Sequence, residues 1–402
     1  MIEKIVELLI KWKVFNLRNN IKYTLEIILL LWKISYLKKR KELTMRITII
    51  GAGNIGTQFA IEFASKGHEV IIFNSDSTKI KKELEMIDET GQVVKKATIY
   101  MATSNIYEAV KDSKYILITY PAFMLKDIAD RMYEYVSKGT KIGIIPGTGG
   151  AEFFFRRYIE KGIEFFGLQR VPAVARLRKY GESVCVTGKR DKLFLASIPS
   201  TCAMEIATLF SEIFEIPCET LPNYLSVTLT PSNPILHTTR LRTLFEDYFP
   251  NKVYDRNPLF YEEWTEKSSE LLLKCDEELQ RVCKELNRLD LSGVRSLRIH
   301  YESNTAKELT KKIQSIKSFQ GLLSPMIEVE NGFIPNFQSR YFTADFPYGL
   351  SIIYQIAKLS GISTPNIKET LEWYYSVTGK CDEFELSDYG ILNKEDIYKF
   401  YR

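Results

Sequence analysis

Residues 46–56 read RITIIGAGNIG, a short β-branched run followed at once by a G-x-G-x-x-G turn. The run has the composition of a buried parallel strand. A helical pattern then extends from Thr57 to Ser65 and stops at Gly67, and residues 70–73 form the next β-branched run. Strand, glycine turn, helix and strand within about thirty residues predict a βαβ unit that binds a dinucleotide.

Each glycine of the turn has its own physical role. Gly51 permits the tight turn, Gly53 lets the backbone approach a pyrophosphate, and Gly56 lets the helix pack against the strand. The unpaired N–H groups at the start of the helix then attract the pyrophosphate charge. The predicted cofactor-binding residues of this turn are Gly51, Ala52, Gly53, Asn54, Ile55 and Gly56.

The residues after the second strand bear on the choice of nicotinamide cofactor. An acidic side chain at this place would bind the ribose of NAD(H), but the chain has Asn74 and Ser75 there. Lysines follow at positions 79, 81 and 82 and could hold a 2′-phosphate, whereas Asp76 argues in the other direction. We therefore favour NADP(H) over NAD(H) and add Asn74 and Ser75 to the predicted cofactor-binding residues.

The character of the chain changes near residue 222. Further strand-like runs occur at residues 115–119, 141–145, 164–166 and 183–187, whereas helical periodicity dominates later, as in residues 261–286 and 306–319. This pattern predicts an α/β fold with an N-terminal Rossmann-type doubly wound sheet followed by an all-α C-terminal domain. We place the dinucleotide-binding domain at residues 45–221 and the helical substrate domain at residues 222–402.

Residues 1–44 differ from the rest of the chain in charge. They contain ten Lys/Arg and four Asp/Glu, so a chain with a net charge of +5 has a nearly neutral body that gives no argument for nucleic-acid binding. Their longest apolar run, residues 27–32, is far shorter than the roughly 20 residues that cross a bilayer. Two interpretations stay open, an amphipathic arm on a membrane or partner, and a tail or gene-start artefact ahead of Met45; we favour the second.

The six cysteines of the chain form no C-x-x-C pair. No metal site or disulfide framework is therefore predicted, and a reducing, cytoplasmic location is expected. Nothing in the sequence indicates an oligomeric state.

His237 stands apart from the other two histidines, His68 and His300, for which we expect structural or surface roles. It lies in residues 230–240, TPSNPILHTTR, where Pro234 suits the first turn of a helix and His237 follows about one turn inside. An imidazole there suits proton transfer near neutral pH. A hydrogen-bonded histidine that helps the helix to start is an equal alternative.

The stretch SRYFTADFPYGL at residues 339–350 contains two further candidates. Asp345 is either the N-cap of a helix that begins near Phe346 or a carboxylate that orients an imidazole. Arg340 is either a surface arginine or a guanidinium that holds a substrate carboxylate through two hydrogen bonds.

Together with the Rossmann start, these stretches resemble the opine dehydrogenase family, which includes the octopine and nopaline dehydrogenases. Residues 233–237 look like the N-P-x-x-H motif of that family, and residues 340–350 look like its R-Y-x-T-x-D-x-P-x-G-L segment. Residues 120–123 are similar to a P-A-F turn at the cofactor edge, which adds Tyr120 and Pro121 to the predicted cofactor-binding residues. The resemblance covers residues 45–375.

The resemblance implies a reversible, NAD(P)H-dependent condensation of an amino acid with a 2-oxo acid such as pyruvate, which yields an N-(carboxyalkyl) amino acid. It implies that His237 is the catalytic acid/base, that Asp345 pairs with it, and that Arg340 binds the carboxylate of the 2-oxo acid. An amino acid and a 2-oxo acid are therefore the expected partners.

Other classes of protein stay open. A β-hydroxyacid, ketopantoate or glycerol-phosphate type dehydrogenase shares the architecture, although many of these use a lysine in an N-x-x-x-K pattern that the chain lacks. A metallophore-type opine synthase would accept a larger amine. A non-catalytic NAD(P)-binding sensor is the alternative outside enzymes.

Overall fold

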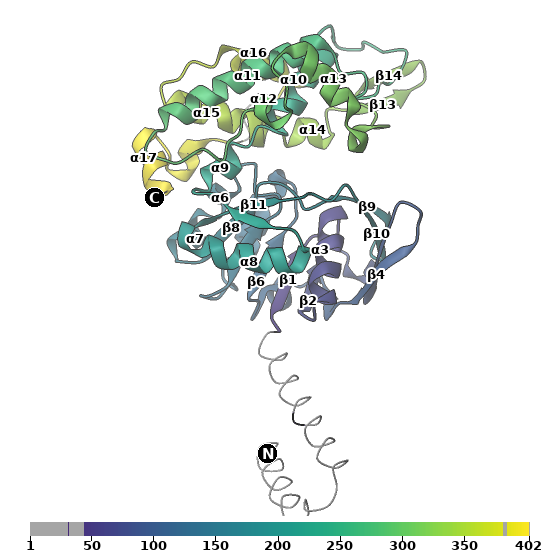
Figure 1. Cartoon of the computed structure of the whole chain (residues 1–402), viewed down its shortest axis with the longest axis vertical. Helices are drawn as coiled ribbons and strands as arrows, with labels where there is room; N and C mark the ends of the chain where they lie inside the picture. Colours follow the sequence, from purple (N-terminus) through teal and green to yellow (C-terminus); the bar gives the residue numbers. More distant parts are fainter. Residues whose placement is uncertain (1–30, 32–43, 381–383, 402) are drawn as a thin grey trace, which may run out of the picture. The chain divides into compact units, whose positions relative to one another are not determined.

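The first half of the chain is built around the strand that precedes the glycine turn. The computed structural model describes residues 31, 44–380 and 384–401 (Figure 1). The predictions made for the leader, residues 1–44, fall almost wholly outside these residues. From Arg46 onward the described residues form one compact unit.

Within the described residues, eight strands form the main sheet in the order β12-β11-β8-β7-β6-β1-β2-β5. Neighbouring strands are parallel except at the β8–β11 pair, which is antiparallel. The strands are β1 (Arg46–Ile50), β2 (Glu69–Phe73), β5 (Met101–Thr103), β6 (Tyr115–Ile118), β7 (Lys141–Ile144), β8 (Glu164–Leu168), β11 (Leu193–Ile198) and β12 (Cys218–Thr220).

Strand β1 is an interior strand of this sheet, and its β-branched side chains fit a surface that is buried on both faces. Ile49 pairs with Ile72 of β2 on one side and with Leu117 of β6 on the other. The chain passes from β1 outward to β2 and β5 and then returns to β6, so the strand order reverses between β1 and β6. The crevice beyond the carboxyl ends of these two strands is where such sheets bind ligands.

Helices cover the sheet in two groups. Helix α3 (Asn54–Ser65) packs on α8 (Ala203–Phe214), where the rings of Phe59 and Phe210 lie 6.3 Å apart. The second group comprises α4 (Ile106–Val110), α5 (Leu125–Met132), α6 (Ala151–Phe154) and α7 (Arg156–Glu160). Each of these helices contacts the next one in the group. The predicted Rossmann-type doubly wound sheet is thereby confirmed.

A second sheet of the described residues has the order β4-β3-β10-β9 and contacts α3. The strand predicted at residues 183–187 is present, but it belongs to this smaller sheet. Its strands are partly exposed, so they lack the continuous apolar run of the central strands. They are β3 (Glu83–Ile87), β4 (Val93–Thr98), β9 (Val174–Lys179) and β10 (Ser183–Thr187).

The second half of the chain is helical, as predicted, with one exception. Strands β13 (Met326–Val329) and β14 (Gly332–Pro335) form a hairpin, so the domain is not strictly all-α. Asn331-Gly332 is a common hairpin dipeptide, but the strands are too short for an alternating pattern. The main helices are α9 (Leu225–Thr228), α10 (Pro234–Leu244), α11 (Glu266–Glu285), α12 (Leu297–His300), α13 (Ala306–Ser315), α14 (Arg340–Thr343), α15 (Ser351–Leu359), α16 (Pro365–Thr378) and α17 (Lys394–Phe400).

The domain boundary that we predict at residues 221–222 lies between β12, the last strand of the main sheet, and α9, the first helix of the helical part. Among the described residues, no helix combines the length and apolar character needed to cross a membrane. The same residues contain no group of three or more His, Cys, Asp or Glu side chains placed to hold a metal ion.

Glu152 is a fully buried carboxyl group at a place where three segments of the chain meet. Its Oε1 accepts hydrogen bonds from the hydroxyl groups of Thr228 and Tyr401, each at 2.5 Å. Its Oε2 has no hydrogen-bond partner among the described residues. Burial disfavours the ionised form and raises the pKa of Glu152 from 4.5 to about 7.

Glu152 should make the stability of the fold depend on pH. Its folded pKa of about 7 exceeds the unfolded value of 4.5, so the unfolded state releases the proton first as pH rises. As pH rises from about 4.5 to about 7, the free energy of unfolding should therefore fall by at most about 3 kcal/mol. Above that range Glu152 should cause no further change. Urea denaturation of the wild type and of Glu152→Gln across this range measures the effect. If the difference between the two proteins does not vary with pH, Glu152 is not the group responsible.

Candidate active site

The glycine turn has the backbone geometry that its motif requires. Gly51 has a φ of +108°, and its N–H donates to the carbonyl of Phe73 at 3.0 Å. A Cβ at Gly56 would lie 1.8 Å from the carbonyl oxygen of Gly51, so only glycine allows α3 to approach β1 this closely. A Cβ at Gly53 would meet no atom within 4 Å, so the space above the turn is open to a ligand.

The start of α3 is suited to hold a pyrophosphate. No side chain caps this helix, and Asn54 instead accepts a hydrogen bond from the N–H of Leu177 at 2.8 Å. The first N–H groups of α3 therefore remain available to an anion. Gly53, Asn54 and Ile55 line a cavity of about 480 Å³, which we call the main cavity. Ala52 is buried beneath the turn. These features fit a bound dinucleotide.

The residues after β2 present an amide and a hydroxyl group rather than a carboxylate. Asn74 donates from its side chain to the Tyr180 hydroxyl, and Ser75 donates to Asn74 Oδ1 at 3.5 Å. The carboxylate of Asp76 forms an ion pair with Lys79 at 2.9 Å. Both side chains are exposed, so this ion pair is a weak surface contact.

Tyr120 and Pro121 follow β6, which is the neighbour of β1 in the sheet. Both residues line a smaller cavity of about 210 Å³, together with Ile55 of the glycine turn. Burial raises the pKa of the Tyr120 hydroxyl, so the group stays protonated. The structure thus places all predicted cofactor-binding residues at the carboxyl edge of the sheet or directly after its strands.

His237 lies in the first turn of α10 and is 7% exposed. Its Nδ1 is 2.7 Å from Asp345 Oδ2, and its Nε2 is 2.9 Å from the Tyr261 hydroxyl. The Tyr261 hydroxyl keeps its proton because burial raises its pKa well above the usual value. A histidine with its hydrogen on Nδ1 satisfies both partners, since it donates to Asp345 and accepts from Tyr261.

Asp345 does not act as the helix cap that its position also allowed. It precedes the π-helical turn Phe346–Leu350, and its side chain makes no capping hydrogen bond there. The carboxylate instead binds the imidazole of His237, 108 positions away in the sequence. This contact is the one expected of a carboxylate that orients a histidine ring.

Arg340 is the first residue of α14, and its side chain has no carboxylate partner among the described residues. It lines the main cavity together with His237 and Gly53, and it lines the smaller cavity together with Asp345. The structure therefore brings the three predicted catalytic and substrate-binding side chains to the walls of two cavities that both reach the glycine turn.

Sequence reasoning missed Tyr261, whose position depends on a buried arginine. Arg240 lies on α10, one turn after His237, and donates to the carbonyl groups of Phe260 at 3.0 Å and Glu263 at 2.8 Å. Burial lowers the pKa of Arg240 to about 10. The same helix therefore carries the catalytic candidate and fixes the backbone on both sides of Tyr261. No local motif marks Tyr261. The helical periodicity of residues 261–286 placed it inside a helix, whereas α11 begins five residues later, at Glu266.

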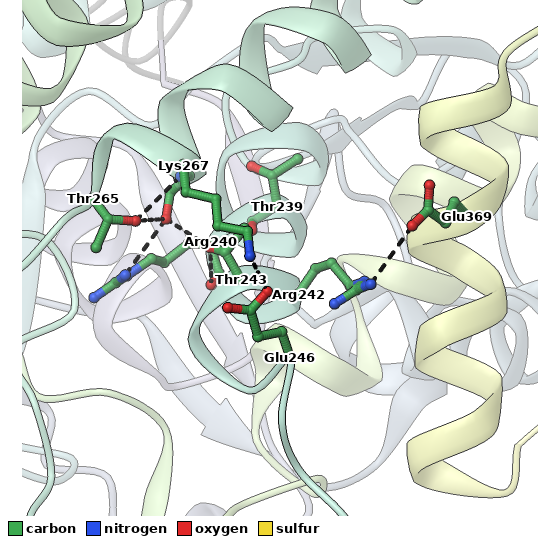
Figure 2. A network of polar contacts seen from close by, with 9 residues as sticks. Thr239, Arg240, Arg242, Thr243, Glu246, Thr265, Lys267 and Glu369 are labelled. Atoms are coloured by element: carbon green, nitrogen blue, oxygen red, sulfur yellow. Dashed lines mark hydrogen bonds and ion pairs between the residues drawn. The ribbon is translucent and has the colours of Figure 1, made fainter.

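Figure 2 shows the polar contacts that hold α10 against its neighbours. The hydroxyl group of Ser268 in α11 lies 2.6 Å from Thr243 and 2.8 Å from Thr265. An ion pair between Lys267 and Glu246 joins α11 to the end of α10, and Arg242 reaches Glu369 of α16 at 3.6 Å. These contacts fix the helix that positions His237.

Two family models divide the chain between them. Residues 46–178 match the N-terminus of NAD-dependent glycerol-3-phosphate dehydrogenase. Residues 220–378 match the α-helical domain of the NAD/NADP octopine/nopaline dehydrogenases, and this match contains His237, Arg340 and Asp345. The chain belongs to the opine dehydrogenase family. The glycerol-phosphate model, one of the alternative classes, matches the first part of the chain alone.

Relatives of known name agree with this assignment. The chain is 26% identical to tauropine dehydrogenase of Arabella iricolor over 298 residues, which is 70% of this chain and 75% of the relative. It is 27% identical to opine dehydrogenase of Haliotis discus hannai over 345 residues, 78% of this chain and 84% of the relative. The structure of octopine dehydrogenase with NADH and L-arginine has a TM-score of 0.78, is 22% identical, and covers 88% of this chain and 98% of its own.

Two alanine substitutions separate the roles of the glycine turn. In Gly56→Ala the added Cβ overlaps the Gly51 carbonyl, so the free energy of unfolding should fall by about 1–3 kcal/mol. In Gly53→Ala the Cβ enters open space, so stability should be unchanged while the methyl group weakens dinucleotide binding. Thermal unfolding with and without NADPH measures both effects. Equal losses of stability in the two variants would contradict this geometry.

Proposed function

We propose that this chain is an opine dehydrogenase that reversibly condenses an amino acid with a 2-oxo acid such as pyruvate, with NAD(P)H as reductant. The observation that carries the proposal is the 2.7 Å contact between His237 and Asp345 beside cavities that the glycine turn and Arg340 also line. Solved structures of octopine dehydrogenase, which has the same fold, contain NADH with L-arginine or pyruvate.

The reaction joins the amine nitrogen to the carbonyl carbon of the 2-oxo acid. Addition of the amine gives a carbinolamine, and loss of water from it gives an imine. When bound, the reduced nicotinamide supplies the hydride that converts the imine carbon to the carbon of a secondary amine, and the nitrogen keeps or takes one proton. The product is an N-(carboxyalkyl) amino acid.

His237 is proposed to transfer the proton at the oxygen that leaves as water. Asp345 fixes the ring through Nδ1, so Nε2 is the atom that exchanges the proton. The Tyr261 hydroxyl holds Nε2 at 2.9 Å before a substrate occupies this position. Since the imidazole is almost completely buried, bulk water has little access to the proton.

Arg340 is proposed to bind the carboxylate of the 2-oxo acid. Its guanidinium lines both cavities, and no carboxylate of the described residues neutralises it. Two parallel N–H···O bonds would hold the carboxylate in one orientation and thereby place the adjacent carbonyl carbon near His237.

We propose NADP(H) as the preferred cofactor. The support is the amide of Asn74 and the hydroxyl of Ser75 directly after β2, the place where an acidic side chain would bind the ribose of NAD(H). A cytoplasmic location also belongs to the proposal, and the five described cysteines, all free thiols, suit a reducing compartment.

His237→Ala should lower kcat by about 10²- to 10⁴-fold and leave NADPH binding nearly unchanged, because the imidazole moves a proton but holds no part of the cofactor. The measurement is the loss of nicotinamide absorbance with pyruvate and a panel of amino acids, run with NADPH and with NADH. His68→Gln, which changes a histidine that lines neither of these cavities, is the control. Wild-type turnover in His237→Ala would show that the mechanism is wrong.

Arg340→Gln should raise the KM for the 2-oxo acid by about 10- to 100-fold, since it removes a charge-assisted pair of hydrogen bonds. Initial rates at varied pyruvate, amine and NADPH separate the three Michaelis constants. An unchanged KM for pyruvate would remove Arg340 from the 2-oxo acid site, and a rise confined to the KM for NADPH would place its guanidinium on the cofactor.

A further inference from the structure

A cavity of about 740 Å³, which we call the arginine cavity, adjoins the main cavity. The two share part of their walls, including Arg170, Arg190, His300 and Phe319. The ring of Phe319 stacks on that of Tyr261 at 4.1 Å, and Tyr261 in turn contacts His237. The arginine cavity is therefore continuous with the walls of the proposed catalytic site, and none of the proposed steps uses it.

The arginine cavity carries an excess of positive charge. Arg170, Arg190 and Arg295 line it, and no ion pair joins any of the three to a carboxylate in the part of the chain that the structure describes. Lys189 also lines the cavity, whereas Lys192 is paired with Glu219 at 2.6 Å. The one acidic side chain among the lining residues is that of Asp191.

The contacts that the three arginines do make are with neutral groups. Arg170 donates to Ser232 Oγ and to His300 Nδ1, each at 3.3 Å. Arg190 donates to the carbonyl of Val171 at 3.0 Å, and Arg295 lies 5.6 Å from the ring centre of Phe194. These contacts position the guanidinium groups but leave their charge without compensation.

Burial and the mutual repulsion of these groups both act on their pKa values. Burial and the nearby Arg190 lower the pKa of Arg170 to about 10. Burial, with Arg170, Arg190 and Arg295, lowers the pKa of His300 to about 4, so this ring is uncharged at neutral pH. It accepts the hydrogen bond of Arg170 on Nδ1 and keeps its hydrogen on Nε2, which makes it one more donor. A cluster of this kind is unfavourable unless an anion binds to it.

We propose that the arginine cavity binds a carboxylate at the far end of one of the two substrates. The enzyme would then act on a dicarboxylic amino acid or a dicarboxylic 2-oxo acid. This inference rests on the proposed function, in which Arg340 holds the carboxylate next to the reacting carbonyl group. Planar guanidinium groups suit this ligand because each can donate two parallel hydrogen bonds to one carboxylate.

Pairs of substrates with and without a carboxylate at the far end test the proposal. One arm compares glutamate with glutamine and aspartate with asparagine, each with pyruvate; the other compares 2-oxoglutarate with pyruvate, each with alanine. In at least one arm, kcat/KM for the dicarboxylic substrate should exceed that of its partner by about 100-fold, because a substrate without the distal carboxylate leaves the arginines unpaired. The arm that responds identifies the substrate. Equal use of charged and neutral substrates in both arms overturns the proposal.

Two variants connect the preference to the cavity. Arg190→Gln and Arg295→Gln should each raise the KM for the dicarboxylic substrate by about 10- to 100-fold and leave kcat and the other KM near wild type. The matched control is Arg298→Gln, three residues beyond Arg295, since Arg298 pairs with Glu277 at 2.8 Å and lines neither cavity. A preference that survives in both variants, or that is lost equally in the control, overturns the proposal.

Calorimetry on the NADPH-loaded protein separates this proposal from the proposed function, because it needs no turnover. Glutamate, 2-oxoglutarate and inorganic phosphate serve as probes. The proposal expects one of the dicarboxylates to bind the wild type and to lose at least about 10-fold in affinity in Arg190→Gln. If phosphate binds the wild type and loses affinity in Arg190→Gln, while neither dicarboxylate binds, the cavity holds a free anion and the proposal is overturned. Absence of NAD(P)H oxidation with every substrate would instead refute the proposed function.

Discussion

The hydrogen bond between His237 and Asp345 requires two segments 108 positions apart to meet at 2.7 Å. The neighbouring residues make this approach possible. A Cβ at Gly349 would lie 2.9 Å from Pro234 Cγ, so the turn that follows Asp345 can pack directly on the start of α10 only with glycine at that position. Pro234 starts the helix that carries His237, and Pro347 lies in the turn after Asp345. Packing thus explains why the two motifs contain prolines and a glycine. The histidine and the aspartate of these motifs are the groups that can take part in a reaction.

A second close backbone approach that needs a glycine links the helical half to the edge of the sheet. Gly149 lies in the turn after β7, where an added Cβ would be 3.1 Å from Ala122 and 3.3 Å from the carbonyl of Tyr348. The segment around Tyr348 therefore lies against the loop that follows β7, and that loop lies against the one that follows β6. Ligands of doubly wound sheets bind at this edge, so a nicotinamide cofactor and the His237–Asp345 pair fall in one region. A reductive condensation needs a hydride donor and a proton donor beside the same substrate carbon.

Local pattern was enough to predict β1, β2, β6, β7 and β8 of the main sheet, because buried runs of apolar residues and glycine turns are read within a few residues. Strands β5 and β12 were missed because each is three residues long, and β11 was missed because its sequence, LFLASI, contains one β-branched residue. It was also enough to find His237, Arg340 and Asp345, once two motifs of the helical half were considered together. Of the smaller sheet only β10 was predicted; β3, β4 and β9, like the β13–β14 hairpin, were missed because their strands are short and half-exposed. Tyr261 and the cluster of Arg170, Arg190 and Arg295 could not be predicted, because they come from loops that only the tertiary fold brings together. Their proposed roles, like those of the motif residues, remain to be measured.

The position of the transferred hydride tests the central claim most directly. The protein is supplied with pyruvate, an amino acid that it uses and NADPH deuterated at the transferring position, and the product is analysed by mass spectrometry. The account predicts a secondary amine that retains the amino-acid nitrogen and carries deuterium on the former carbonyl carbon of pyruvate. Deuterated lactate, with the amino acid left unchanged, would contradict it, since the hydride would then have reduced a ketone and the imidazole–carboxylate pair would serve a hydroxyacid dehydrogenase.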